Sequence, residues 1–122
     1  MAEFNRLKLS SDSTNMLKTL QSRTGITPNI LCRFALCYSL DQKIISNLVQ
    51  IKEDGMEIAR YTLFGDNEMI YISLVKEKCK ELGLDPEKDF MKVLKVYINN
   101  GIITLYARVK GLEDFINLIE NE

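Results

Sequence analysis

The chain has 122 residues, 46% of them apolar and 27% charged, which is enough for one hydrophobic core under a solvated surface. It has no histidine, which excludes Ser-His-Asp and Cys-His catalysis and any histidine-ligated metal site, and its three cysteines argue against a disulfide framework. The formal net charge of −1 excludes a uniformly basic protein, and we predict one domain over residues 1–122 with no metal and no cofactor.

The first predicted element is a short extended segment. Residues 6–9 alternate between polar and apolar side chains, which is the period of a strand with one buried face. We expect Leu7 and Leu9 to face the core, and Arg6 and Lys8 to face the opposite side. The serines that follow can accept hydrogen bonds from the free N–H groups of a helix start.

Two helices joined by a tight turn come next. The first is predicted over residues 12–24 and ends before Gly25, a residue suited to the left-handed conformation just past a helix end. The second is predicted from Pro28 to about Leu40, with Thr27 as its N-cap and proline at a position that needs no N–H.

The second helix is apolar on almost every side, with Arg33 as its one charge. A helix of this kind must be buried all round, and a small domain has little room for a wholly central helix. We therefore expect one face to pack against a neighbouring subunit, the alternative being a central helix of a monomer. The predicted interface residues are Ile30, Leu31, Phe34 and Tyr38.

Residues 41–65 are less regular. Apolar residues in the segment 44–49 continue the helical spacing, and residues 52–55 have the composition of a turn. Residues 57–64 have β-type composition and fit either an extended arm or half of a hairpin.

The C-terminal half, residues 66–122, is predicted to be helical. Its expected boundaries are, in chain order, a start at Asp66, a stop at Gly83, a start at Asp85-Pro86, a stop at Gly101 and a break near Gly111. The overall prediction is a mainly α, single-domain protein with a short N-terminal extended segment. No apolar run approaches the ~20 residues of a membrane span and the first six residues are too polar for a signal peptide, so we expect a cytoplasmic protein.

The order of strand, helix, glycine turn and threonine-led helix over residues 1–50 is that of ribbon-helix-helix proteins. In those proteins the strands of two chains pair into a ribbon that enters the major groove of DNA. Arg6 and Lys8 would lie on the outer face of such a strand. Thr27 and Asn29 would lie at a helix start whose N–H groups suit phosphate oxygens, although a purely capping role is the competing interpretation.

The charge is unevenly distributed along the chain. Residues 1–50 hold six basic and three acidic side chains, whereas residues 51–122 hold ten basic and fourteen acidic ones. Such an asymmetry suggests that the N-terminal part faces a polyanion. The predicted DNA contacts are Arg6, Lys8, Lys18, Arg23, Thr27, Asn29 and Lys43.

Several blocks of the sequence resemble the DndE family, the small subunit of the bacterial DNA sulfur modification (DNA phosphorothioation) system. The most specific is the TGITPNI block at residues 24–30, and a second is the RYTLFG block at residues 60–65. The other similar blocks are Leu9-Ser10, residues 17–20, Arg33-Phe34-Ala35, residues 83–86, residues 101–110 and Leu112-Glu113-Asp114.

The resemblance implies a small helical, ribbon-helix-helix-like protein that assembles into a tetramer and binds DNA, with a preference for nicked duplex. It implies no catalytic role, because partner proteins with cysteine desulfurase, iron–sulfur and ATPase activities carry out the sulfur transfer. This chain departs from the family in being slightly acidic, so strong DNA binding would need several subunits to gather their N-terminal charges on one face.

Two other functions remain open at this point. The chain could be a ribbon-helix-helix transcriptional regulator or antitoxin that reads a specific operator, although its long C-terminal half is unusual for one. It could also be a structural adaptor that touches no DNA and works through its acidic half.

Overall fold

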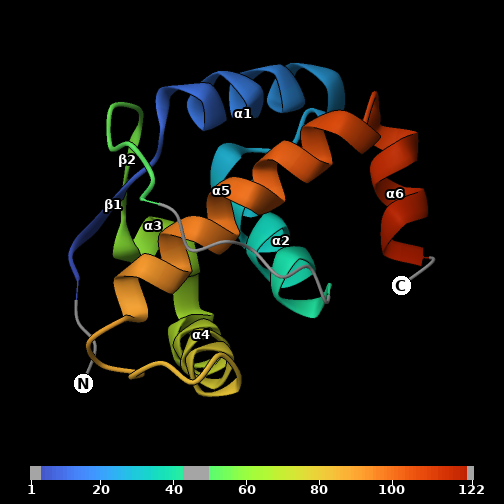
Figure 1. Ribbon diagram of the computed structural model, residues 1–122. Coiled ribbons are helices and arrows are strands. Elements are labelled where there is room, and N and C mark those ends of the chain that lie inside the picture. The colour runs from blue at the N-terminus through green and yellow to red at the C-terminus, as the bar shows by residue number, and fades with distance from the viewer. Residues whose placement is uncertain (1–3, 43–49, 121–122) are drawn as a thin grey trace.

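The computed structural model describes residues 4–42 and 50–120, which form a mainly α-helical domain (Figure 1). The elements in chain order are β1 (Arg6–Lys8), α1 (Ser11–Thr24), α2 (Pro28–Asp41), β2 (Glu57–Ala59), α3 (Arg60–Phe64), the 3-10 turn η1 (Gly65–Asn67), α4 (Glu68–Glu81), α5 (Phe90–Arg108) and α6 (Leu112–Glu120).

The predicted boundaries of the first two helices are confirmed, whereas the strand pairing between two chains that a ribbon-helix-helix protein would have is not, because β1 pairs within its own chain. The Oγ of Ser10 accepts a hydrogen bond from the backbone N–H of Ser13 at 3.1 Å, which caps α1. Gly25 ends α1 in the left-handed region at φ +76°, where its N–H donates to the carbonyl of Gln21. Thr27 then precedes α2, with Pro28 as its first residue.

Strand β1 pairs with β2 of the same chain in an antiparallel two-stranded sheet, in which Leu7 faces Ile58. The pairing continues past β1, because the N–H of Leu9 donates to the carbonyl of Met56 at 2.9 Å. Residues 57–64 are therefore part strand and part helix: residues 57–59 are the second half of the hairpin-like pair, and residues 60–64 form α3.

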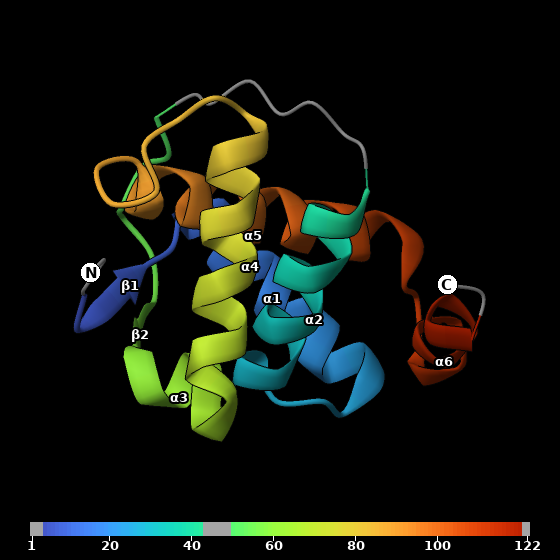
Figure 2. The ribbon, with the colours of Figure 1, turned by 90° about the horizontal axis from the view of Figure 1, so that it is seen from below.

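Helix α5 crosses the middle of the domain and packs against α2, α1 and α4 (Figures 1 and 2). The predicted stop at Gly101 is wrong, because α5 runs through it to Arg108. Gly101 marks a close approach of two helices instead. A Cβ added there would lie 2.7 Å from the carbonyl carbon of Ala35 in α2, so only glycine lets the two backbones meet.

The expected start at Asp85-Pro86 is also wrong. The Asp85 carboxylate accepts hydrogen bonds from the backbone N–H groups of Glu87 and Lys88, at 2.8 and 3.2 Å, and so closes a turn rather than a helix. Helix α5 begins later, at Phe90. At the other start, Asp66 belongs to η1, and α4 begins at Glu68.

Helix α2 is buried mainly by other helices of the same chain. Leu31 is fully buried and Tyr38 is 5% exposed, with the Tyr38 hydroxyl accepting a hydrogen bond from Arg108 at 2.8 Å. Their assignment to a subunit interface is therefore corrected: both are core residues of one chain. Ile30, 41% exposed, and Phe34, half-buried, keep surface for a partner, and for them the interface stays a prediction.

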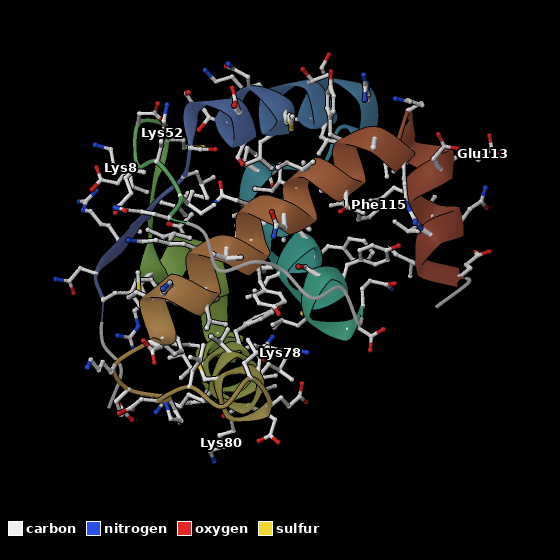
Figure 3. The ribbon with its side chains drawn as sticks, in the orientation of Figure 1. Lys8, Lys52, Lys78, Lys80, Glu113 and Phe115 are labelled. Atoms are coloured by element: carbon white, nitrogen blue, oxygen red, sulfur yellow. The ribbon has the colours of Figure 1, made fainter. Side chains whose placement is uncertain are left out.

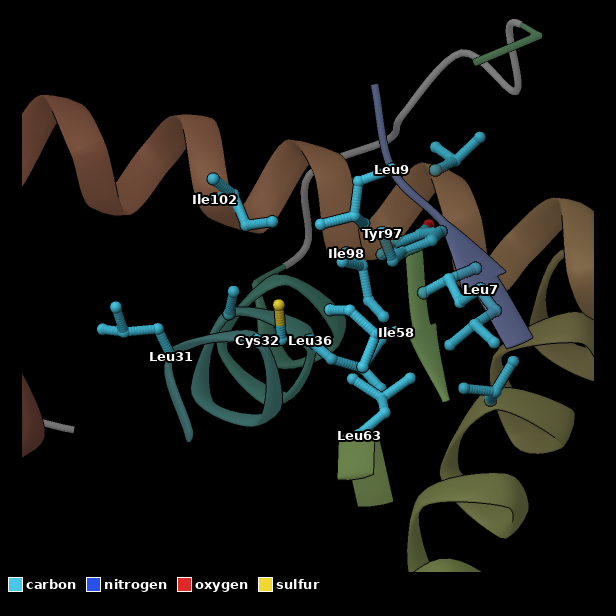
Figure 4. Close-up of a cluster of buried hydrophobic side chains, with 14 of the residues drawn as sticks. Leu7, Leu9, Leu31, Cys32, Leu36, Ile58, Leu63, Tyr97, Ile98 and Ile102 are labelled. Atoms are coloured by element: carbon cyan, nitrogen blue, oxygen red, sulfur yellow. The ribbon is translucent and has the colours of Figure 1, made fainter. Parts of the chain in front are cut away.

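The core fills the space between the two-stranded sheet, α2, α5 and α3 (Figure 4). Leucine and isoleucine side chains from all of these elements are buried together, with Leu7 and Leu9 among them as expected. The labelled members are Leu7, Leu9, Leu31, Cys32, Leu36, Ile58, Leu63, Tyr97, Ile98 and Ile102. Across the described ranges, none of the helices has the length and apolar content needed to cross a bilayer.

Candidate nucleic-acid interface

The outer face of β1 carries two exposed cations. Leu7 is fully buried, so the strand alternation turns Arg6 and Lys8 outward, as predicted. Within residues 4–42 and 50–120, neither side chain forms an ion pair. Glu57 faces Lys8 across the sheet and shares its side, so this small face carries two positive charges and one negative charge.

The start of α2 lies beside this strand. Arg6 and Asn29 line one groove of about 380 Å³, whose other lining residues are Pro28, Thr62, Met56 and the three residues of β2, the acidic Glu57 among them. Within the described chain the Thr27 side chain makes no capping hydrogen bond, so its exposed hydroxyl is free for another partner. The first turn of a helix also leaves N–H groups without intrahelical acceptors. The groove thus joins a guanidinium, an amide and a helix N-terminus, a combination that suits a phosphate oxygen.

The two predicted contacts on α1 differ from each other. Lys18 is exposed and free of ion pairs among the described residues. Arg23 is half-buried: its Nη1 donates to the carbonyls of Tyr106 and Val109, each at 3.2 Å, and its guanidinium lies 4.8 Å from the Tyr106 ring centre. Arg23 therefore ties the end of α1 to the end of α5, a structural role that the sequence did not reveal.

Lys52 is a cation that the sequence prediction missed. It is exposed, and in Figure 3 it projects from the same corner of the molecule as Lys8. Its neighbour Glu53 accepts from Lys95 at 2.8 Å, and Asp54 accepts from the N–H of Ser11 at 2.8 Å. The hydrogen bond from Ser11 and, to a smaller extent, the charge of Lys52 lower the pKa of the Asp54 carboxyl. In the sequence, Glu53 and Asp54 follow Lys52 directly, so this segment does not look basic. Lys43, also predicted to contact DNA, lies outside the described residues.

Outside β1, α1 and Lys52, several basic residues are held by carboxylates or by backbone groups. The ion pairs are Arg60–Glu68, Lys76–Glu87 at 3.2 Å, Lys78–Glu81 at 2.9 Å and Lys95–Glu53 at 2.8 Å. Arg33 donates to the carbonyls of Leu63 and Thr62, at 2.6 and 3.1 Å. The exposed lysines of the C-terminal half, Lys80, Lys88, Lys92 and Lys110, are spread over α4, the turn after it, α5 and the α5–α6 connection.

The three cysteine thiols are not activated as nucleophiles. Burial raises the pKa of the Cys32 thiol to about 12, and burial likewise raises the pKa of the Cys37 and Cys79 thiols. The hydrogen bonds to Asp85 lower the pKa of that carboxyl and hold it as a turn residue. In the portion of the chain that the structure describes, no cluster of three metal-type ligands is formed.

Comparison with known proteins decides the family. The family model for the DNA sulphur modification protein DndE matches residues 6–111, which is most of the chain and includes the strand, the helix turn and the groove. The chain belongs to the DndE family. No curated protein matches it.

The fold of the family agrees with the structure described above. The chain is similar to the crystal structure of DndE from Escherichia coli B7A, described as involved in DNA phosphorothioation modification, with a TM-score of 0.71 and 28% identity over 86% of this chain and 98% of that chain. It is also similar to a DndE G21/24K mutant, described as involved in DNA phosphorothioation, with a TM-score of 0.68 and 25% identity over 86% of this chain and 99% of that one.

Proposed function

We propose that this chain is a non-catalytic component of the DNA sulfur modification machinery that binds the DNA backbone through β1 and the start of α2, and that docks other proteins of the system. The observation that carries the proposal is the pair of outward cations Arg6 and Lys8 beside the open first turn of α2. Lys18 and Lys52 would extend the contact, and Thr27 and Asn29 would supply hydrogen bonds to phosphate.

The proposed contact is with phosphates rather than with bases. Arg6 and Lys8 stand on a strand only three residues long, and Glu57 beside them would be repelled by a phosphate that came too close. Such a face offers few groups for reading base edges but can hold a backbone in position. A protein of this kind tolerates many sequences, and a nick, which makes the duplex easier to bend, would be accommodated.

The charge of one subunit is small, so we propose that several subunits act together as a homotetramer. Each phosphate that a basic side chain neutralises steepens the dependence of log affinity on log salt by about 0.9. Four copies of a face with two or three free cations would reach the affinity that a single copy lacks. Because the machinery modifies DNA, we propose that the protein acts in the cytoplasm.

We assign the sulfur chemistry to partner proteins. The sequence has no histidine to activate a nucleophile, and burial raises the pKa of all three thiols, so none of the cysteines is prepared to attack as a thiolate. The chain would act by positioning the DNA, which it would hold in place while an enzyme of the system modifies that DNA.

The test is fluorescence anisotropy of labelled intact and singly nicked duplexes of unrelated sequence, measured over a salt series. The Arg6→Ala/Lys8→Ala double variant should lower the salt slope by roughly 2 for each subunit that contacts DNA, because two phosphate contacts are lost. Lys80→Ala is the matched control, since Lys80 lies at the opposite end of the molecule from Lys8 in Figure 3 and should leave the slope unchanged.

Two outcomes would contradict the proposal. One is an unchanged slope in the double variant, which would place DNA elsewhere or nowhere on the chain. The other is a single favoured sequence, bound by about 10³-fold or more over others, which is the behaviour of a sequence-specific regulator. Arg23→Ala should weaken binding less than Arg6→Ala does, because Arg23 is already engaged with two carbonyls.

A further inference from the structure

A second groove lies between α2 and α4, away from the cations of β1. The two helices run side by side in Figure 2, and the groove between them has a volume of about 540 Å³. Its lining changes character along its length. Phe34, Leu40 and Leu74 make it apolar, and Asp41, Glu77 and Glu81 make one end acidic.

The apolar part continues beyond the groove itself. Leu74 is 43% exposed, and Ile70, one turn before it on the same face of α4, is 59% exposed. On α2, Ile30 stands one turn before Phe34 and is also exposed. Phe34 is supported from behind by Phe115 of α6, with ring centres 4.7 Å apart. Together, these side chains form an apolar strip that is larger than the single exposed apolar residues of an ordinary protein surface.

The acidic end is reinforced by the backbone. Asp41 is the last residue of α2 and Glu81 the last of α4, so both carboxylates stand where a helix already carries partial negative charge. Acidic residues are disfavoured at such positions, and α2 has no basic residue in its last turn to compensate. Lys78 cancels part of this charge through its 2.9 Å ion pair with Glu81, which leaves Asp41 and Glu77 uncompensated within the described residues.

We propose that this groove docks an amphipathic helix of another protein of the DNA sulfur modification machinery, in place of the neighbouring subunit that the sequence predicts at Ile30 and Phe34. The helix would place apolar side chains between Phe34 and Leu74 and lysine or arginine side chains against Asp41 and Glu77. The identity of the partner's system rests on the proposed function, but the chemistry of the occupant rests on the groove. The acidic end would repel DNA phosphates, so one subunit can hold DNA at β1 and a protein here at the same time.

The probe is a pair of synthetic 18-residue helical peptides. Both carry leucine at i, i+3, i+4 and i+7, and they differ in having four lysines or four glutamates in the last two turns. Titration of the isotope-labelled full chain, followed by amide NMR, should place the shifts caused by the lysine peptide on α2 and α4. The lysine peptide should bind at least about tenfold more tightly than the glutamate peptide, and its affinity should fall as salt rises.

Two variants and a matched control locate the contact. Leu74→Lys and Glu77→Lys should each weaken the lysine peptide by roughly tenfold, since the first blocks the apolar strip and the second reverses a charge at the acidic end. Met69→Lys is the control, because Met69 is 65% exposed on the same helix but lies on another face. All three positions are exposed, so the variants should fold.

Three outcomes would overturn the proposal: equal binding of the two peptides, equal effects of Leu74→Lys and Met69→Lys, or no binding of the lysine peptide at about 1 mM. A fall in the native mass of Leu74→Lys would also overturn it, because a second copy of the chain would then occupy the groove. DNA binding is measured separately on the same variants. If the wild type fails to bind DNA but binds the lysine peptide, the proposed DNA contact fails and the docking groove stands.

Discussion

Replacing Gly101 by alanine tests the close approach of α5 to α2 at Ala35. The added Cβ would lie 2.7 Å from the carbonyl carbon of Ala35 and 3.1 Å from its Cα, whereas carbon atoms normally approach to ~3.5–4.0 Å. The backbones of α2 and α5 would have to separate by roughly 1 Å, and the buried side chains between them would lose part of their packing.

The size of the effect follows from two opposing contributions. Overpacking of backbone against a side chain costs about 3 kcal/mol, the upper end of the usual range, because a helix backbone cannot rotate away. Alanine favours the helical state over glycine by about 1 kcal/mol, which leaves a net destabilisation of about 2 kcal/mol. Urea unfolding followed by far-ultraviolet circular dichroism measures this as a lower midpoint with an unchanged slope.

Gly111→Ala is the matched control. No described atom lies within 4 Å of a Cβ at Gly111, and its backbone is not left-handed, so its stability should change by less than about 1 kcal/mol. If Gly101→Ala were as stable as the wild type, α2 and α5 would not approach each other at Gly101, and the account of the core would be refuted.

Three further predictions concern single side chains. Arg33→Lys should destabilise the fold by about 1.5–3 kcal/mol in urea unfolding, because a lysine cannot reproduce the paired donation to the carbonyls before Phe64; equal stability would contradict this. Asn99→Ala should cost about 1–3 kcal/mol in the same assay, since the amide is 2% exposed and its Oδ1 accepts from the N–H and hydroxyl of Ser10; a neutral effect would show that these bonds do not hold the start of α1 to α5. Burial raises the pKa of the Cys32 thiol from 9.0 to about 12, so the thiol loses its proton at a lower pH in the unfolded state than in the folded state. The free energy of unfolding should therefore fall as the pH rises from 9 toward 12. Cys32→Ala should show a shallower fall, and parallel curves for the variant and the wild type would contradict the burial.

Elements fixed by neighbouring residues could be predicted from the sequence. Gly25, followed by Thr27-Pro28, determines the end of α1 and the start of α2 through local backbone preferences, and the structure has both boundaries there. The alternation at residues 6–9 likewise placed Leu7 and Leu9 in the core. In each case the cause and the effect lie within a few residues of each other.

Elements fixed by distant contacts could not be predicted. Glycine is typical of a helix end, but Gly101 lies inside α5, where a side chain would clash with the backbone of Ala35, which is far away in the sequence. Asp85-Pro86 has the same form as Thr27-Pro28, and its carboxylate accepts from the next two N–H groups as an N-cap would, yet only one turn follows it before α5 begins at Phe90. The apolar surface of α2 was recognised, but the helix that covers most of it, α5, was not identified as its cover.

Several residues of the candidate interface were predicted from the sequence, but their arrangement in space was not. Arg6 and Asn29 were both named from the sequence, but the groove that joins them needs β2, which pairs with β1 from the middle of the chain. Arg23 was assigned to DNA because a charge off the apolar stripe has no visible partner in the sequence. Its acceptors are main-chain carbonyls near the end of α5, which no residue-type pattern can reveal.

The central place of α5 has a consequence for how the protein is made. A ribosome releases α1 and α2 well before Phe90–Arg108 has been synthesised, so during that interval the apolar sides of α2 have no cover. We expect the growing chain to bind chaperones until α5 emerges. Strand β1 also waits for β2, so the proposed DNA-binding face cannot form before residues 57–59 have been synthesised.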